Sequence, residues 1–201
     1  MELRIDGRKV EAEPGMTILQ AARRAGIHIP TLCYHEALSP YGACRVCLVE
    51  LRREGRSRLV TACNYPVEEA EGAEVLTASE RVLRNRRMVV EMLLFRCPHV
   101  RVVQDLARQV GIERPRFEPE DPAEDCVLCG LCVRACREIV GVEAIELVDR
   151  GVHTRVRPPF EQPPQSCIGC GSCAYVCPTG HIRLEERDGV RVIWNLSLIH
   201  I

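Results

Sequence analysis

Eight cysteines between residues 126 and 177 have the spacing best suited to chemistry in this chain. They form two runs of the pattern Cys-x2-Cys-x2-Cys-x3-Cys, and the second run ends in Cys-Pro. The runs are Cys126, Cys129, Cys132 and Cys136, then Cys167, Cys170, Cys173 and Cys177. Three thiols within seven residues can hold three corners of a [4Fe–4S] cubane. The repeated pattern therefore predicts two [4Fe–4S] clusters.

The fourth thiol of each run is expected to bind the cubane of the other run. We assign one cluster to Cys126, Cys129, Cys132 and Cys177, and the other to Cys167, Cys170, Cys173 and Cys136. Zinc is the alternative, because Cys-x2-Cys is also zinc spacing. Zinc sites combine two separated pairs and do not need further thiols behind each pair, so the doubled pattern favours iron–sulfur clusters.

A third group of cysteines lies nearer the N-terminus and has another spacing. Its members are Cys33, Cys44, Cys47 and Cys63, with intervals of ten, two and fifteen residues. Gly42 lets the backbone turn tightly before the close pair, so that amide groups can point at sulfur. We predict a [2Fe–2S] cluster here, although the plant-type rule has a first interval of four residues.

Two residues near these groups allow other interpretations. Cys33-Tyr34-His35 raises a Rieske site, in which two histidines replace two cysteines on one iron. That site needs a second histidine two residues after a later cysteine, and the fourth thiol at Cys63 favours all-cysteine ligation instead. Cys97 lies outside the three groups, and we expect a half-buried thiol there rather than a reactive or ligating one.

The elements around the first group predict a β-grasp domain over residues 1–78. They are a hairpin over residues 1–12 with an Asp6-Gly7 turn, a helix from a Thr17–Gln20 capping box to Gly26, and strands at 48–51 and 59–62. Hairpin, helix, cysteine loop and further strands in this order suit a small mixed domain that holds one cluster.

Residues 79–124 are predicted to be a helical linker, with a helix from the Ser79 cap to about Phe95 and a shorter one over 102–110. Residues 125–187 hold both cubane motifs, with a strand-like insertion at 142–157. Ile139 and Ile182 follow the two motifs and are expected to pack beneath the clusters. The fold class is therefore α+β.

The composition limits the compartment and the partners. Thirteen cysteines exceed ordinary packing needs, and the charged start of the chain, Met1–Arg8, lacks the apolar segment of a signal peptide. No apolar run is long enough to span a bilayer, so we expect a cytoplasmic protein without direct membrane insertion. The formal net charge of −1 becomes more negative once clusters of about −2 each are bound, which argues against a nucleic-acid partner.

The last residues, 188–201, are predicted to be a tail that is truncated. Residues 196–201, Leu-Ser-Leu-Ile-His-Ile, are what one reading frame of a widely used transposon-end sequencing adapter would encode. We interpret them as an artefact and expect the natural chain to continue differently after Asn195.

Residues 1–194 resemble the iron–sulfur subunit of soluble NAD-linked oxidoreductases. The family includes the diaphorase gamma subunit of NAD-reducing hydrogenases, the amino-terminal part of the large iron–sulfur subunit of complex I (an NADH dehydrogenase), and NAD-dependent formate dehydrogenase alpha chains. The segments that carry the resemblance are Ile29–His35, Gly42–Cys47, Cys129–Cys136 and Cys170–Cys173. The resemblance implies an N-terminal [2Fe–2S] ferredoxin domain and a C-terminal bacterial-type 2[4Fe–4S] ferredoxin domain.

One departure from the family concerns the linker. The family has a further [4Fe–4S] site there, in which a histidine is followed by Cys-x2-Cys-x5-Cys. In this chain His99 is followed by Val103, Leu106 and Ile112 at those offsets, so we expect that cluster to be absent.

The resemblance implies an electron-transfer subunit without substrate turnover of its own. It would relay electrons between a flavoprotein subunit that oxidises NAD(H) and a partner subunit with a catalytic metal site. No Gly-x-Gly-x-x-Gly follows a strand, so no dinucleotide pocket is predicted in this chain. Two alternatives stay open: the truncated N-terminal segment of a formate dehydrogenase or [FeFe]-hydrogenase catalytic chain, and a free ferredoxin-like shuttle.

Overall fold

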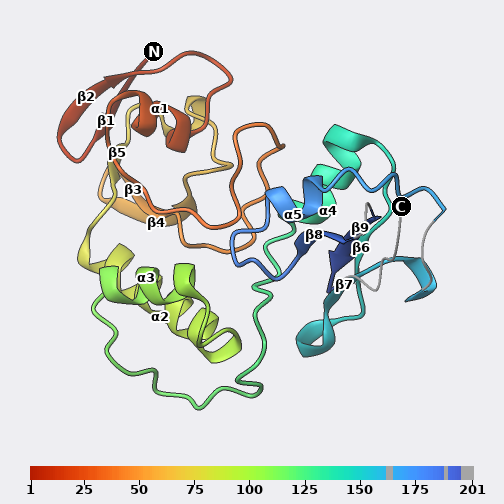
Figure 1. Ribbon diagram of the computed structural model, residues 1–201. Coiled ribbons are helices and arrows are strands. Elements are labelled where there is room, and N and C mark those ends of the chain that lie inside the picture. Colours follow the sequence, from red (N-terminus) through yellow and green to blue (C-terminus); the bar gives the residue numbers. More distant parts are fainter. Residues whose placement is uncertain (162–164, 188–189, 196–201) are drawn as a thin grey trace. The chain divides into compact units, whose positions relative to one another are not determined.

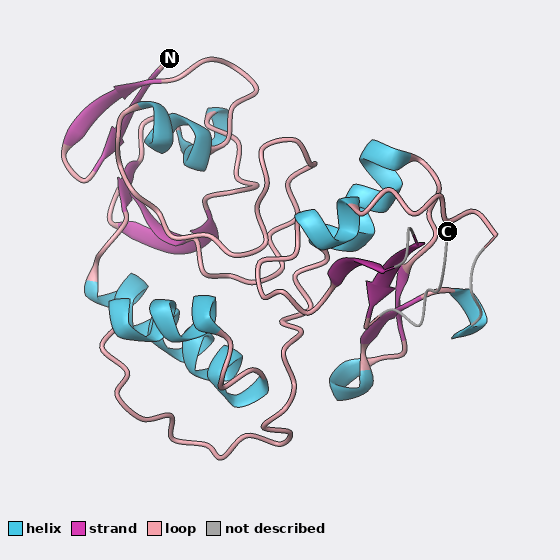
Figure 2. Cartoon of the chain, in the orientation of Figure 1, coloured by secondary structure: helices cyan, strands magenta, loops and turns pink. Residues whose placement is uncertain are grey.

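The computed structural model describes residues 1–161, 165–187 and 190–195. Within it the chain divides into two compact units (Figures 1 and 2). The first unit comprises Met1–Tyr34, Pro40–Phe95 and Val103–Glu118, and the second comprises His35–Ser39, Arg96–Val102 and the chain from Pro119 onward. Each unit contains helices and strands, as the α+β prediction requires.

A five-stranded sheet forms the framework of the first unit. Its strands are β1 (Glu2–Ile5), β2 (Arg8–Glu11), β3 (Leu48–Arg53), β4 (Arg56–Thr61) and β5 (Glu74–Leu76). Their order is β2-β1-β5-β3-β4, and β1 and β5 are parallel while the other neighbours are antiparallel. Asp6 and Gly7 both have positive φ in the β1–β2 turn, which confirms the predicted hairpin.

Helix α1 (Ile18–Arg24) completes the core of this unit. Thr17 forms the predicted capping box, since its hydroxyl accepts from the amide of Gln20 and its own amide donates to the Gln20 side chain. Ile18 and Leu19 are fully buried in one core cluster with Leu3 and Val49 from the sheet. The helix is therefore fixed both at its start and along its apolar face.

Helices α2 (Glu80–Arg96) and α3 (Arg101–Gln109) follow the sheet along the chain. Ser79 caps α2, because its hydroxyl accepts from the Val82 amide at 3.2 Å. The spacing of apolar residues predicts a stripe of Val82, Val89, Val90, Leu93 and Leu94. Val82, Val90 and Leu94 are buried, whereas Val89 and Leu93 are half-buried. Helix α2 also buries two charged residues that the apolar stripe does not include, Arg86 and Glu91.

The second unit is built from short elements around two similar cysteine runs. They are α4 (Leu131–Arg134), the π-helix η2 (Ala135–Val140), α5 (Ser172–Tyr175), and the antiparallel pairs β6 (Glu146–Val148) with β7 (Arg155–Arg157) and β8 (Arg183–Arg187) with β9 (Val190–Trp194). Single 3-10 turns lie at Glu68–Ala70 in the first unit and at Gly151–His153 and Pro159–Glu161 in the second. The β6–β7 hairpin confirms the predicted strand-like insertion.

The expectation that Ile139 packs beneath a cluster is wrong. Ile139 is 59% exposed, whereas Ile182 is buried as expected. Residues 135–140 form a π-helix, whose i→i+5 bonding rotates the following side chains away from their α-helical positions. Ile145 is the buried residue instead, and it shares a core cluster with Ile182.

In the part of the chain that the structure describes, no helix combines the length and apolarity needed to cross a bilayer. The suspected artefact at 196–201 lies outside the described residues.

Candidate metal centres

The four cysteines of the N-terminal group come together in the first unit. Cys33, Cys47 and Cys63 are buried and Cys44 is half-buried. The Cys44 amide donates to the sulfur of Cys33 at 3.4 Å. Hydrogen bonds between side chains pair Cys33 with Cys44 and Cys47 with Cys63. The loop after α1 thus meets the ends of the strands β3 and β4 at one group of sulfur atoms.

The pKa values of this group reflect how close its thiols lie to one another. The hydrogen bond to Cys33, together with burial, raises the pKa of Cys44, and the bond to Cys47 does the same for Cys63. The pKa of Cys47 is lowered because Cys63 donates to it. Thiols so close together repel one another once ionised, and bound iron removes that repulsion by neutralising the thiolates.

Gly42 fixes the cysteine loop against the end of β4. Its φ is +71°, and a Cβ at this position would lie 2.7 Å from Nδ2 of Asn64. The Asn64 side chain is held in turn by a hydrogen bond from the Thr61 hydroxyl. Any residue with a side chain would therefore be strained and would displace Asn64, as the sequence led us to expect of this loop.

The second group joins the two cysteine runs. Burial raises the pKa of Cys132, and its electrostatic neighbours are Cys129, Cys126 and Cys177. The pKa of Cys126 is likewise raised, chiefly by burial, with Cys177 among its neighbours. Cys177 is distant in sequence from the other three, so the fold itself brings the last thiol of the second run to the first triad.

The third group combines the last cysteine of the first run with the first three cysteines of the second run. Burial raises the pKa of Cys136, whose sulfur neighbours are Cys167 and Cys170. Burial also raises the pKa of Cys173 to about 12, with Cys170, Cys136 and Cys167 around it. These four cysteines line one cavity together with the aliphatic side chains of Val142, Ile145 and Ile193.

Backbone amides point at several of these sulfur atoms. The Ala144 amide donates to the sulfur of Cys136 at 3.2 Å. Backbone amides also hydrogen-bond Cys126, Cys132 and Cys173 and lower their pKa against the larger effect of burial. Such bonds stabilise thiolates and tune iron–sulfur clusters. Quartets of thiols with amide donors and aliphatic walls fit iron–sulfur clusters, although the ligand assignment itself stays a prediction.

Cys97 and His35 are not among the predicted cluster ligands. Cys97 is completely buried, more than the half-buried thiol expected, and burial raises its pKa to about 12. This keeps Cys97 a neutral thiol and suits a packing role. Nδ1 of His35 accepts a hydrogen bond from the Ala37 amide at 3.2 Å, a local turn contact.

The residue that the sequence reasoning missed is Arg86. It is only 6% exposed, and its guanidinium donates to the carbonyl oxygens of Val46 and Leu48, on both sides of Cys47. The helical spacing could have indicated its burial, because position 86 lies four residues from Val82 and from Val90 and so shares a helix face with them and with Leu94.

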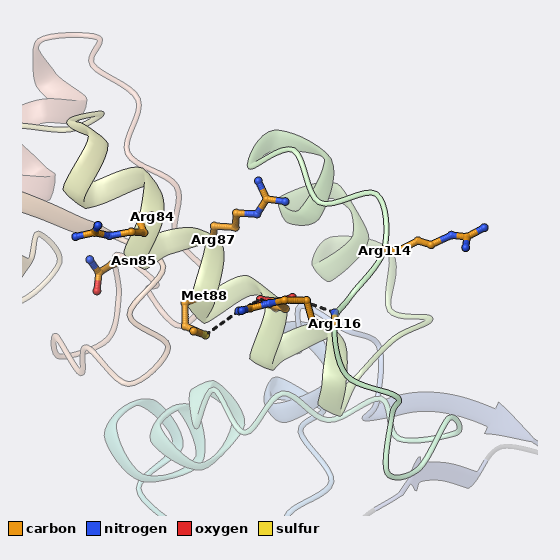
Figure 3. A pocket seen from close by; sticks show the side chains of 7 residues that line it. Arg84, Asn85, Arg87, Met88, Arg114 and Arg116 are labelled. Carbon is orange, nitrogen blue, oxygen red and sulfur yellow. Dashed lines mark hydrogen bonds and ion pairs between the residues drawn. The ribbon is translucent and has the colours of Figure 1, made fainter.

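A basic hollow lies on α2 and the segment after α3. It is lined by Arg84, Asn85, Arg87, Met88, Glu91, Arg114 and Arg116. Figure 3 shows Arg116 lying along α2 with its guanidinium directed toward Met88, whereas Arg84 and Arg114 point away from each other. Nε of Arg116 donates to both carboxylate oxygens of Glu91, at 2.8 and 2.9 Å. The arginines therefore form a broad basic face rather than a compact anion site.

Two family models match the chain and agree with the two kinds of cysteine group. A 2Fe-2S iron-sulfur cluster binding domain matches residues 1–80, and a 4Fe-4S dicluster domain matches residues 125–181. The chain is thus an iron–sulfur protein with electron-transfer domains. The [2Fe–2S] domain precedes the dicluster domain, as predicted, and the secondary structure is mixed.

Comparison with known proteins shows which iron–sulfur proteins the chain is similar to. The chain is 37% identical over 179 residues to the NADPH-Fe(3+) oxidoreductase subunit alpha of Geobacter sulfurreducens, covering 77% of this chain and 20% of that protein. It is 34% identical over 176 residues to the mitochondrial NADH-ubiquinone oxidoreductase 78 kDa subunit of Candida albicans, covering 75% of this chain and 24% of that one. A chain in the crystal structure of an NAD+-reducing [NiFe]-hydrogenase in the H2-reduced state superposes with a TM-score of 0.68 at 31% identity, over 79% of this chain and 74% of that chain.

The chain belongs to the family of iron–sulfur subunits shared by these NAD(P)-linked oxidoreductases and the hydrogenase. This confirms the resemblance seen in the cysteine motifs. The chain spans about a fifth to a quarter of the length of the curated relatives it matches.

Proposed function

We propose that the chain relays single electrons between a flavoprotein subunit that oxidises NAD(H) and a partner subunit with a catalytic metal site. The observation that carries this proposal is that cysteine side chains lie near one another in three groups, with Cys177 among the neighbours of Cys132 and Cys136 among those of Cys173. Three clusters in one chain would give an electron successive sites between a donor and an acceptor, because each cluster carries one electron at a time.

The proposed cofactors are one [2Fe–2S] and two [4Fe–4S] clusters. Cys33, Cys44, Cys47 and Cys63 would hold the [2Fe–2S] cluster. Cys126, Cys129, Cys132 and Cys177 would hold one cubane, and Cys167, Cys170, Cys173 and Cys136 the other. When bound, the clusters supply one-electron redox chemistry. The limits at residues 78, 124 and 187 that separate the domains are predictions of the same kind.

The protein's own part is to hold the thiolates and to control their surroundings. Backbone amides such as that of Ala144 stabilise negative charge on sulfur, while Val142 and Ile145 keep water from the wall of the third quartet. Cys170 is the exposed member of that quartet, and Ile168 beside it is 61% exposed. An exposed ligand next to an apolar side chain supports an electron entry or exit point at this edge.

Two further features support the binding of a partner protein and a location in a reducing compartment. The outward face of α2 combines the arginines of the basic hollow with exposed Met88 and Met92, and arginine and methionine are enriched at protein interfaces. A chain with thirteen cysteines, twelve of which would bind metal, suits a reducing compartment such as the cytoplasm, where disulfides are rare. We therefore expect a cytoplasmic complex in which an acidic surface of a partner faces α2.

The test is anaerobic purification of the complex from its native source, followed by reduction with NADH. We expect a flavoprotein to copurify, and NADH to bleach the clusters only when that flavoprotein is present. Bleaching by NADH in the isolated chain would contradict the relay, because it would require a nucleotide site in this chain.

The length of the curated relatives favours a second candidate, a segment of a larger oxidoreductase chain. These relatives are about four to five times longer than their matched parts, whereas the hydrogenase chain is matched over 74% of its length. The genomic sequence beyond Asn195 separates the two. A catalytic metal domain encoded in the same frame supports the segment, and an early stop codon supports the separate subunit.

A further inference from the structure

Arg86 is a buried cation at the base of the N-terminal cysteine loop. Its Nε donates to the carbonyl oxygen of Val46 at 3.0 Å, and Nη2 donates to those of Leu48 and Thr77 at 2.7 and 3.1 Å. Val46 and Leu48 are the two neighbours of Cys47 in the chain. One side chain from α2 thus holds the backbone on both sides of this cysteine.

No carboxylate pairs with Arg86 among residues 1–161, 165–187 and 190–195. Glu50, the buried carboxylate of β3, interacts instead with Arg52 and with the hydroxyls of Ser79 and Ser57. A buried charge without a counter-charge is strongly unfavourable, and carbonyl dipoles compensate for it only in part. Arginine keeps its proton in proteins even when burial lowers its pKa, as it does here.

The negative group that faces Arg86 is the cysteine quartet itself. Cys47, which lies between the two residues that Arg86 binds, interacts electrostatically with the guanidinium and raises the pKa of Arg86 against the larger effect of burial. An oxidised [2Fe–2S] cluster with four thiolates carries about −2, and one added electron makes this about −3. The fixed positive charge therefore interacts more favourably with the reduced cluster than with the oxidised one.

We propose that Arg86 is a positioning residue that raises the reduction potential of the [2Fe–2S] cluster through its buried positive charge. The inference rests on the proposed function, because it takes Cys33, Cys44, Cys47 and Cys63 as the ligands. The step is the transfer of one electron from a donor to the cluster, with no bond formed or broken and no proton moved.

The experiment is an anaerobic redox titration of the whole chain with dithionite as the one-electron donor. The [2Fe–2S] signal is followed by electron paramagnetic resonance, and iron and spins per chain are counted for each variant. The variants are Arg86→Met, which keeps much of the length and removes the charge, and Arg86→Lys, which keeps the charge and loses the fork of donors. Arg87→Met is the matched control, since Arg87 is the next residue of α2 and is exposed.

At the wild-type midpoint, the ratio of reduced to oxidised cluster is expected to fall about tenfold or more in Arg86→Met. A tenfold change corresponds to about 59 mV for a one-electron couple. Arg86→Lys and Arg87→Met are expected to stay within about threefold of the wild type.

An unchanged midpoint in Arg86→Met with its cluster intact would overturn the inference. So would equal shifts in the Met and Lys variants, or loss of the cluster from both, because either result assigns the effect to the hydrogen bonds and not to the charge. A wild-type chain that lacks any [2Fe–2S] signal after reconstitution contradicts the proposed function instead.

Discussion

Cys177 is the residue at which the exchange of ligands between the cysteine runs can be tested. Its neighbours are Cys126 and Cys132 of the first run, although it belongs to the second run in sequence. We expect Cys177→Ser to impair the cubane of the first triad and to leave the cubane of Cys167, Cys170 and Cys173 with its full set of thiols. Iron content and electron paramagnetic resonance of the reduced protein measure both clusters.

Cys97→Ser is the control for that prediction, because Cys97 is a buried thiol of the same unit outside the quartets. It should keep both cubane signals. If Cys177→Ser removed only the signal of the Cys167–Cys173 triad, the crossed assignment would be wrong.

Gly42 is the second test at the scale of single residues. Gly42→Ala places a Cβ against Asn64 and forces a side chain into positive φ, and we expect a loss of about 1–3 kcal/mol in the stability of the first unit. Gly72→Ala has a similar φ of +69° but meets nothing within 4 Å, so it separates backbone strain from the clash. Anaerobic urea unfolding measures both, and equal losses in the two variants would contradict a role for the Asn64 contact.

Helix α2 shows how far its sequence pattern could predict an element. The Ser79 cap, the helix and the burial of Val82, Val90 and Leu94 follow from capping and periodicity. The burial of Glu91 could not be predicted, because its partner Arg116 lies 25 residues further along the chain. Local patterns indicate which residues face a core, whereas a buried charge depends on where a distant segment returns.

The cysteine motifs of the second unit show the same limit. Their spacing predicts which thiols bind each cubane, because the spacing is set by the dimensions of a cubane, and this assignment stays a prediction. It did not predict that a π-helix rotates Ile139 outward and that Ile145 is buried in its place. The wider turn of a π-helix has no simple signature in sequence, and the inserted β6–β7 hairpin obscures the repeat.

The Ser79 cap gives a prediction for α2 as an element. Ser79→Ala removes the acceptor for the Val82 amide, and we expect a loss of about 1 kcal/mol in the free energy of unfolding of the first unit. Ser79→Thr keeps a hydroxyl that can accept from the Val82 amide and donate to Glu50, and it should restore most of it. Urea unfolding followed by circular dichroism distinguishes the variants, and an unchanged midpoint in Ser79→Ala would show that the cap contributes nothing.

The Glu91–Arg116 pair gives α2 a dependence on pH. The hydrogen bond from Arg116 lowers the pKa of Glu91 to about 2, below the ordinary value of about 4.3. A lowered pKa in the folded state stabilises the fold above the ordinary value, and this contribution is lost as pH falls from about 4.3 toward 2. Glu91→Gln should therefore destabilise the first unit at pH 6 and have a smaller effect at pH 3.5.

Asp105→Asn is the control for this pH dependence, because Asp105 forms an exposed ion pair with Arg108 on α3. It should change stability little at either pH. Unfolding of the two variants is compared at pH 6 and 3.5, and an effect of Glu91→Gln that does not shrink on acidification would contradict the lowered pKa.

At the scale of the whole molecule, the clusters are expected to hold much of the second unit together. Its helices α4 and α5 have only four residues each, which is too short for stability of their own. Removal of iron and sulfide with a chelator should therefore unfold this unit, because metal binding supplies folding free energy. Hydrogen exchange measures the change, and it should be largest for residues 126–145 and 167–182. Protection that survives removal of the metal would show that the polypeptide core suffices.

Anaerobic reconstitution with iron and sulfide, followed by metal analysis and electron paramagnetic resonance, tests the central claim most directly. We predict about ten irons per chain and signals from both a [2Fe–2S] and [4Fe–4S] centres after reduction. A colourless protein that binds zinc in place of iron, or an iron content that leaves one quartet empty, would contradict this claim.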